Sequence, residues 1–189
     1  ETFTSREALN TLPGTKALLE AMLKDEASFD QAKADAAYAT KLEQWKATMA
    51  AAKGKADVDR KRLPKKPDAP KRPLLTEGRP GVLYAAMIHP FVGYTMRGAI
   101  WYQGEGNAKP GAVPYDQTLP LMINDWRKRW GDEFSFYYVQ LASYHAPSTE
   151  PGTPDAWALC QDRMRLVLAT TPKTGMAITN DVGEANDIH

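Results

Sequence analysis

Two short segments combine residue types that acyl transfer and hydrolysis require. In Gln103–Asn107 (QGEGN), two amides and a carboxylate alternate with two glycines. An amide N–H can stabilise a developing oxyanion, and glycine lets a ligand approach the backbone closely. In Asp181–His189 (DVGEANDIH), a histidine follows a carboxylate by two positions. Such a histidine can act as an oriented general base or as a metal ligand, and the residues alone also allow a polar turn and a surface histidine.

A metal or nucleotide interpretation finds little support in the remaining residues. A metal site needs three or four convergent ligands. Apart from His189, the chain has only His89 and His145, both in other segments, and Cys160 as its single cysteine. The Gly-x-Gly of the first segment lacks the third glycine of a dinucleotide fingerprint. We therefore expect no metal and no cofactor.

A hydrolytic nucleophile is not evident in the chain. No serine lies in a Gly-x-Ser-x-Gly elbow or in a strand–Gly-x-Ser turn; the serines are Ser5, Ser28, Ser135, Ser143 and Ser148. Cys160 falls on the apolar face of an expected helix, which favours a core position over a reactive one. A serine hydrolase built from this chain would need a nucleophile upstream of Glu1, so we interpret the chain as a fragment that is inactive by itself.

Composition places the chain among globular proteins. It has 189 residues, 43% of them hydrophobic and 25% charged, with a net charge of +1. That length suits one ordinary domain with a small appendage, and no apolar run approaches the roughly 18 residues of a membrane span. The charge is uneven, because residues 41–80 hold twelve basic and five acidic side chains. A basic block can bind nucleic acid, but this one lacks interleaved aromatic residues and a recognition-helix pattern.

The N-terminal 80 residues are expected to form a helical arm and a linker. Residues 15–54 are rich in alanine, lysine, glutamate and leucine and contain no proline. Tyr38, Leu42, Trp45 and Met49 recur at helical spacing and predict one apolar stripe. Prolines then follow at every third position from 64 to 73, which favours an extended, solvated segment.

The remainder alternates strand and helix patterns. β-Branched and aromatic runs predict strands at Arg97–Gln103, Phe134–Leu141 and Thr174–Asn180. Apolar residues at helical spacing predict helices at Pro114–Trp130 and Pro154–Ala169. This alternation predicts a mainly parallel sheet covered by helices, whose active sites lie beyond the carboxyl ends of the strands. Both candidate segments follow expected strands.

The block Gly98–Glu105 (GAIWYQGE) resembles a block of the sialate O-acetylesterases, a branch of the SGNH-type carbohydrate esterases. Further segments resemble this family in order and spacing, so that about 110 residues are covered. They are Leu83–Tyr84, Met87–Pro90, Tyr115, Leu119–Pro120, Asp125–Arg127, Tyr138–Ala142, Gln161 and Asp187–His189.

The resemblance implies a partial flavodoxin-like α/β/α fold and a serine esterase that removes O-acetyl groups from sugars. Residues 81–189 would form the second half of the esterase domain, and residues 1–80 a helical insertion with a basic linker. The substrate would be an O-acetylated carbohydrate, with no nucleic acid and no membrane span involved. Family members that act on glycans are often exported, so we expect a periplasmic or secreted protein.

The resemblance also assigns roles to individual residues. His189 would be the general base and Asp187 its carboxylate partner, with Asp181 as an alternative, since the position three before the histidine is Asn186. Gln103 and Gly104 would form the oxyanion hole. Three neighbours would support this loop or contact substrate: Trp101, Glu105 and Asn107.

Two other functions remain open from the sequence. An acetyl-xylan or other polysaccharide acetylesterase would share the same machinery, because substrate choice depends on loops around the site. A non-catalytic carbohydrate-binding protein is the alternative outside enzymes, although the tryptophans at strand and helix positions are more typical of a core.

Overall fold

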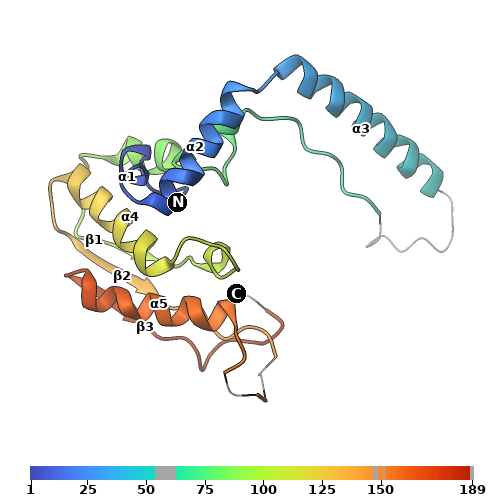
Figure 1. Ribbon diagram of the computed structural model, residues 1–189. Coiled ribbons are helices and arrows are strands. Elements are labelled where there is room, and N and C mark those ends of the chain that lie inside the picture. The colour runs from blue at the N-terminus through green and yellow to red at the C-terminus, as the bar shows by residue number, and fades with distance from the viewer. Residues whose placement is uncertain (54–62, 147–148, 151, 188–189) are drawn as a thin grey trace. The chain divides into compact units, whose positions relative to one another are not determined.

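The computed structural model describes residues 1–53, 63–146, 149–150 and 152–187. They divide into two compact units, one formed by Glu1–Leu19 with Pro80–His189 and the other by Glu20–Arg79 (Figure 1). The helices are α1 (Arg6–Leu9), α2 (Pro13–Ala27), α3 (Gln31–Ala52), α4 (Tyr115–Trp130) and α5 (Ala156–Thr170), with short 3₁₀ or π helices at η2 (Pro73–Leu75), η3 (Tyr84–Ile88), η4 (His89–Phe91) and η5 (Glu105–Asn107). The strands are β1 (Gly98–Trp101), β2 (Ser135–Val139) and β3 (Thr174–Ala177).

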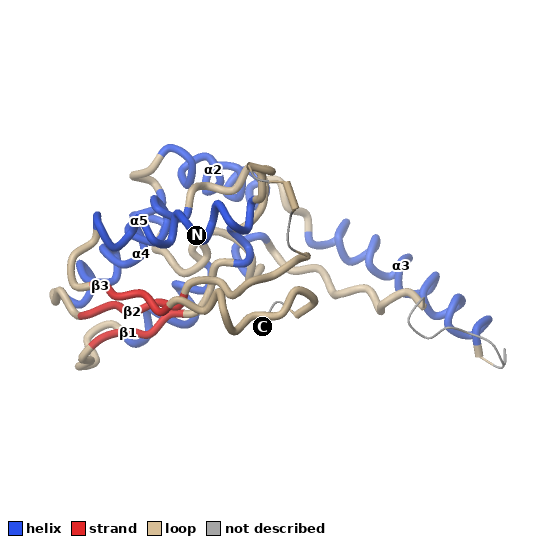
Figure 2. Tube along the Cα trace, turned by 90° about the horizontal axis from the view of Figure 1, so that it is seen from below, coloured by secondary structure: helices blue, strands red, loops and turns tan. Residues whose placement is uncertain are grey.

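The three strands form a parallel sheet in the order β1-β2-β3. Trp101 lies opposite Tyr138, and Tyr138 lies opposite Met176, so the three strands end at nearly the same level. Helices α4 and α5 make the two crossovers. Because both crossovers progress in the same direction and share one hand, both helices lie on the same face of the sheet (Figure 2). The parallel sheet with its helices confirms the α/β class expected from the sequence.

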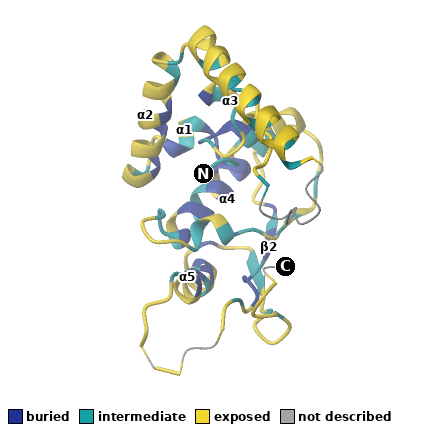
Figure 3. Cartoon of the chain, turned by 90° about the vertical axis from the view of Figure 1, so that its right-hand side faces the viewer, coloured by how far each residue is buried: buried dark blue, intermediate teal, exposed yellow. Residues whose placement is uncertain are grey.

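The core lies between the sheet and these two helices. Phe136 and Tyr138 of β2 are almost fully buried, as are Ile123 of α4 and Met164 of α5. Figure 3 shows the inner sides of α4 and α5 as buried. Arg127, which is buried on α4, donates hydrogen bonds to the carbonyl of Phe134 at 2.9 Å and to that of Pro172 at 2.9 Å. One guanidinium thus secures the starts of β2 and β3.

The other face of the sheet is open in the described residues. Ile100 of β1 is 85% exposed and Tyr137 of β2 is 55% exposed, whereas their neighbours along the strands point into the core. Within the described residues the structure therefore contains the sheet and one helical layer of the expected three-layer architecture. Among these residues, we also find no helix that combines the length and hydrophobicity needed to cross a membrane.

The N-terminal segment packs on α4 rather than with the helical arm. The Ser5 N–H donates to Asp125 Oδ2 at 2.7 Å, and its hydroxyl donates to Asp125 Oδ1 at 2.8 Å. The indole of Trp126 donates to the carbonyl of Phe3 at 2.9 Å. Residues 1–80 were expected to form one insertion, but these long-range bonds join residues 1–19 to the α/β unit.

The second unit contains α3 and the proline-rich segment that returns along it. No residue of α3 is buried, in agreement with the mostly exposed helix in Figure 3. The stripe expected at Tyr38, Leu42, Trp45 and Met49 is half-buried. The Trp45 indole donates to the carbonyl of Pro64 at 2.9 Å, so this aromatic side chain contacts an extended chain and not a second helix.

Candidate functional site

The carboxyl edge of the sheet brings the two candidate segments into one region. Parallel strands end at the same edge, so residues after β1 and residues after β3 emerge on the same side of the sheet. Strand β2 lies between them, and its own trailing segment, 140–146, separates the two. Both candidate segments lie against the residues that follow β2, since Gly104 packs on the Leu141 side chain and Gly183 on backbone atoms of Ser143.

Tyr115, at the start of α4, holds the Gln103 loop. Its hydroxyl donates to the Gln103 carbonyl at 2.7 Å and accepts from the Trp101 indole at 3.1 Å. The Gln103 side-chain oxygen lies 3.4 Å from the same hydroxyl. Burial raises the pKa of Tyr115 well above that of a free tyrosine, so the phenol remains a donor at all physiological pH values. The single hydroxyl proton is directed to the Gln103 backbone carbonyl, so the side-chain oxygen makes only a weak second contact, and the Gln103 NH₂ group donates to no described residue.

Trp101, the last residue of β1, packs between this loop and the aromatic residues of the core. Its ring packs edge-on against Phe3 at 5.1 Å and against Trp126 at 5.8 Å between centroids. Together with its indole bond to Tyr115, these contacts use both the face and the N–H of the side chain. Whether Trp101 supports the loop or contacts substrate stays a prediction.

The Glu105 side chain folds back onto the backbone of Gly104. The Gly104 N–H donates to Glu105 Oε2 at 2.9 Å, so this backbone donor is already occupied by a carboxylate. The Gly104 carbonyl accepts from the Asn107 N–H at 2.8 Å. A methyl group on Gly104 would lie 3.2 Å from the Leu141 side chain, so the loop rests tightly on the end of β2. Gly104 can serve an oxyanion only when the Glu105 carboxylate moves away.

The segment after β3 is tied to the end of β2 by side chains. The Thr179 hydroxyl donates to the Gln140 carbonyl at 2.7 Å, and the Ser143 hydroxyl donates to the Asn180 carbonyl at 2.6 Å. The Gln161 amide of α5 donates to Leu141 O at 2.7 Å and to Asn180 Oδ1 at 3.0 Å. These bonds fix the first residues of the segment that leads to the predicted base.

Further along, this segment is exposed. The His145 N–H donates to the Ala185 carbonyl at 3.0 Å. A methyl group on Gly183 would lie 2.6 Å from backbone atoms of Ser143, so only glycine allows this close approach. Both carboxylate candidates, Asp181 and Asp187, are exposed. Asp187 donates its N–H to the carbonyl of Glu184 at 3.3 Å, in a short turn.

The predicted base lies outside the described residues. The pairing of His189 with Asp187 or Asp181 stays a prediction. Among the residues that the structure describes, no three histidine, cysteine, aspartate or glutamate side chains lie together as a metal cluster would.

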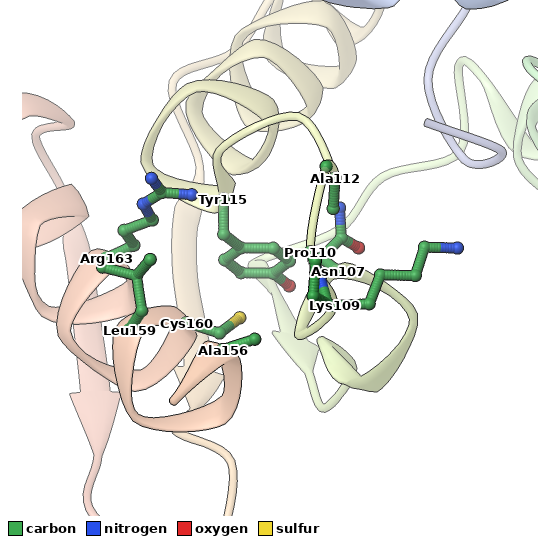
Figure 4. Close-up of a pocket in the computed structure, with 10 residues that line it drawn as sticks. Asn107, Lys109, Pro110, Ala112, Tyr115, Ala156, Leu159, Cys160 and Arg163 are labelled. Atoms are coloured by element: carbon green, nitrogen blue, oxygen red, sulfur yellow. The ribbon is translucent and has the colours of Figure 1, made fainter. Parts of the chain in front are cut away.

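Beside the Gln103 loop lies a cavity of about 160 Å³ between the chain following η5 and the first turns of α4 and α5 (Figure 4). Its lining includes Asn107, Lys109, Tyr115, Leu159, Cys160 and Arg163. Cys160 is buried, and its sulfur lies 3.9 Å from the Gly104 carbonyl. Burial raises the pKa of this thiol to about 11, so it is neutral at physiological pH, in agreement with the core role expected from the sequence.

Tyr115 and the N-terminal residues were not recognised as site elements from the sequence. Tyr115 was noted as a family-matching position but given no role, since the partner of a tyrosine hydroxyl has no local signal. The Ser5–Asp125 pair spans 120 residues and likewise leaves no pattern along the chain. Gln161 was noted only as a family-matching position, and its bonds to the two strand-end segments become apparent in the structure.

Comparison with solved structures defines the class of protein. The chain resembles the crystal structure of a carbohydrate acetylesterase from Xanthomonas citri, with a TM-score of 0.55 and 38% identity. The match covers 60% of this chain and 26% of that one. The chain therefore contains part of an α/β fold of the SGNH-type carbohydrate esterases.

Comparison with curated proteins finds similarity to sialate O-acetylesterases. The sialate O-acetylesterase of Mus musculus is 36% identical over 114 residues, which are 55% of this chain and 21% of that protein. The sialate O-acetylesterase of Homo sapiens is 32% identical over 130 residues, which are 64% of this chain and 25% of that protein. No protein-family model matches the chain. Over the matched part, the chain is similar to sialate O-acetylesterases, and it spans about a quarter or less of the length of these relatives.

Proposed function

We propose that this chain supplies the second half of the active site of a serine esterase that hydrolyses O-acetyl esters of sugars. The observation that carries the proposal is the Gln103 loop. It lies at the carboxyl edge of a parallel sheet, its carbonyl is bound by a buried tyrosine, and its sequence lies in a segment related to carbohydrate acetylesterases. Such a loop offers a preorganised amide donor where an acyl oxygen gains charge.

The proposed reaction uses His189 as general base and then as general acid. His189 removes the proton from a serine hydroxyl contributed by sequence outside these 189 residues, and the serine oxygen attacks the acetyl carbonyl. The Gln103 NH₂ group donates to the oxygen that becomes negative. His189 then returns the proton to the leaving sugar hydroxyl, and water repeats the cycle to release acetate. Asp187 orients the imidazole and stabilises its charged form.

Gly104 would join the oxyanion hole after a local change. Its N–H now binds the Glu105 carboxylate, which occupies the place of an acceptor. A developing oxyanion with a second donor from Gln103 can displace that carboxylate, which then becomes solvated. The exposed position of Gly106 next to it gives Glu105 room to move.

A broader substrate class is the second candidate. The solved relative from Xanthomonas citri is described as a carbohydrate acetylesterase without restriction to sialic acid. The residues discussed above act on the acetyl group and not on the sugar, so they suit acetylated xylan equally well.

Acetate release by the full-length protein tests the proposal. O-Acetylated sialic acid and acetylated xylan are supplied separately, and acetate is measured with a coupled enzyme assay. We expect release from at least one substrate, with the preferred one identifying the sugar class. If the folded protein releases acetate from neither and binds both, it is a carbohydrate-binding protein and the proposal is wrong.

A further inference from the structure

The cavity beside the Gln103 loop is placed to contact a substrate. Tyr115 forms part of its wall and at the same time binds the Gln103 carbonyl. Asn107, two residues beyond Glu105, forms another part. The Tyr115 side chain therefore lies between a ligand in this cavity and the predicted oxyanion donor, Gln103. A sugar bound in the cavity could thus carry its acetyl ester next to the Gln103 loop.

The lining of the cavity favours a negatively charged group. Figure 4 shows Arg163 and Leu159 on one side, Asn107 and Lys109 on the other, and Tyr115 and Cys160 between them. None of the described residues that line it is acidic. Because burial keeps the Cys160 thiol and the Tyr115 phenol protonated, neither adds negative charge.

Arg163 has capacity to bind a carboxylate. Its side chain is 31% exposed, and its Nε lies 3.7 Å from Asp116 Oδ1, which is long for a direct hydrogen bond. Its guanidinium makes no hydrogen bond within the described part of the chain. The planar guanidinium presents several N–H donors and matches a carboxylate in a two-point geometry. Asp116 holds the side chain in place but leaves these donors available.

The other lining residues suit the rest of an acidic sugar. The Asn107 side chain makes no hydrogen bond to another described residue and can bind a hydroxyl or an N-acetyl group. The Leu159 side chain and the Tyr115 ring offer apolar surface for a methyl group or for sugar C–H groups. Lys109 is exposed, and Figure 4 shows its amine extending away from the cavity, so Arg163 is the cation directed at a ligand there. Two carboxylates lie near: Asp116, which faces Arg163, and Asp155, which accepts hydrogen bonds from the first N–H groups of α5.

We propose that this cavity is the subsite for the carboxylate of an acidic sugar, and that Arg163 determines the preference for acidic over neutral acetyl esters. The proposal rests on the esterase function proposed above. It predicts that Arg163 contributes to the use of a charged sugar ester and not to the chemistry of the acetyl group.

Kinetics of the full-length protein test this assignment. Arg163→Gln is compared with wild type and with Arg165→Gln, whose arginine is on the same helix but pairs with Asp162 outside the cavity. With O-acetylated N-acetylneuraminic acid, we expect Arg163→Gln to lower kcat/KM about tenfold or more, as for loss of a charge-assisted hydrogen bond. With p-nitrophenyl acetate, all three proteins should be alike. Equal losses on both esters, or no loss on either, would overturn the proposal.

A binding measurement separates this proposal from the proposed function. N-Acetylneuraminic acid and its neutral methyl ester are titrated into wild type and Arg163→Gln, and binding is followed calorimetrically. We expect the acid to bind more tightly than the ester to wild type only. If this preference is present without any acetate release, the esterase function fails and the subsite stands. If acid and ester bind alike while acetate is released, the subsite fails and the esterase stands.

Discussion

The two segments at the carboxyl edge differ in how the fold holds them. The Gln103 loop is fixed from within, by the buried Tyr115 hydroxyl at its carbonyl and by the Leu141 side chain against Gly104. The segment after β3 is fixed at its start by Thr179 and Gln161 and then runs exposed to Asp187. The Gln103 loop is thus held by the buried Tyr115 side chain, whereas the described residues that precede the predicted base are held by part-buried bonds at Thr179 and by exposed bonds at Asn180.

This difference separates two kinds of mutational effect. A donor that buried contacts already hold in position need not reorganise during the reaction, so removal of that donor should lower kcat. A segment held by exposed hydrogen bonds opens locally at low free energy, so its variants should appear first in local dynamics. The variants below test this distinction in the full-length protein.

The largest effect is expected for Gln103→Leu. Removing the amide donor should lower kcat about 100- to 1,000-fold with little change in KM, as for other oxyanion-hole donors. Acetate release measures the change. Gln117→Leu, at an exposed position of α4, is the control and should be active. A Gln103→Leu enzyme within twofold of wild type would show that this loop is not the charge-stabilising element.

Tyr115→Phe should have the next largest effect. It removes the donor to the Gln103 carbonyl and frees the Gln103 side chain to turn, so we expect kcat to fall about tenfold. Tyr138→Phe is the matched control, since its buried hydroxyl donates to the Met164 carbonyl at 2.8 Å, away from the loop. Both variants should lose about 0.5–1.5 kcal/mol of unfolding free energy for the hydrogen bond removed. Equal kcat values for the two would contradict a positioning role for Tyr115.

Gln161→Ala should affect the second segment alone. Loss of its bonds to Leu141 and Asn180 should speed hydrogen exchange of amides in 178–187 while amides in 103–107 exchange as before. We expect only a few-fold decrease in kcat. Asp162→Ala, at the exposed neighbouring position, is the control. Faster exchange in both segments would mean that they form one cooperative unit and that the contrast drawn here is wrong.

The last prediction concerns the reactivity of Cys160, a buried thiol next to the Gly104 carbonyl of the Gln103 loop. Its pKa is raised from 9.0 to about 11 by burial, so the thiol stays neutral in the folded chain. Alkylation by iodoacetamide at pH 8 should be much slower in the native protein than in urea. Because only the unfolded thiol ionises between about pH 9 and 11, its contribution to stability is complete below pH 9 and decreases as pH rises through that range. Equal native and unfolded alkylation rates at pH 8 would contradict the burial.

Regular elements with strong periodicity could be predicted from the sequence. Helix α4 was expected from Pro114 and begins at Tyr115, and β2 lies within its expected range. Strand β1 is shorter than expected, because the chain leaves the sheet after Trp101, where the Gln103 carbonyl turns to the Tyr115 hydroxyl. A run of strand-forming residues does not reveal where such a tertiary bond ends the strand.

Contacts between distant segments could not be predicted. Ser5 binds a carboxylate 120 residues away, and nothing near either residue indicates the pairing. The Glu105 carboxylate closes on the Gly104 N–H, a local geometry that residue type alone does not specify. The positions of the site loops followed from parallel-sheet topology, whereas the bonds that set their donors required the structure.

Active-site labelling tests the central claim most directly. The full-length protein, as wild type and as His189→Ala, is treated with a fluorophosphonate, and the adduct is located by peptide mass spectrometry. We expect one labelled serine in the wild type, outside the 189 residues described here, and greatly slowed labelling in His189→Ala. An adduct on one of the five serines of this chain, no adduct on the folded protein, or equal labelling of both proteins would contradict the account.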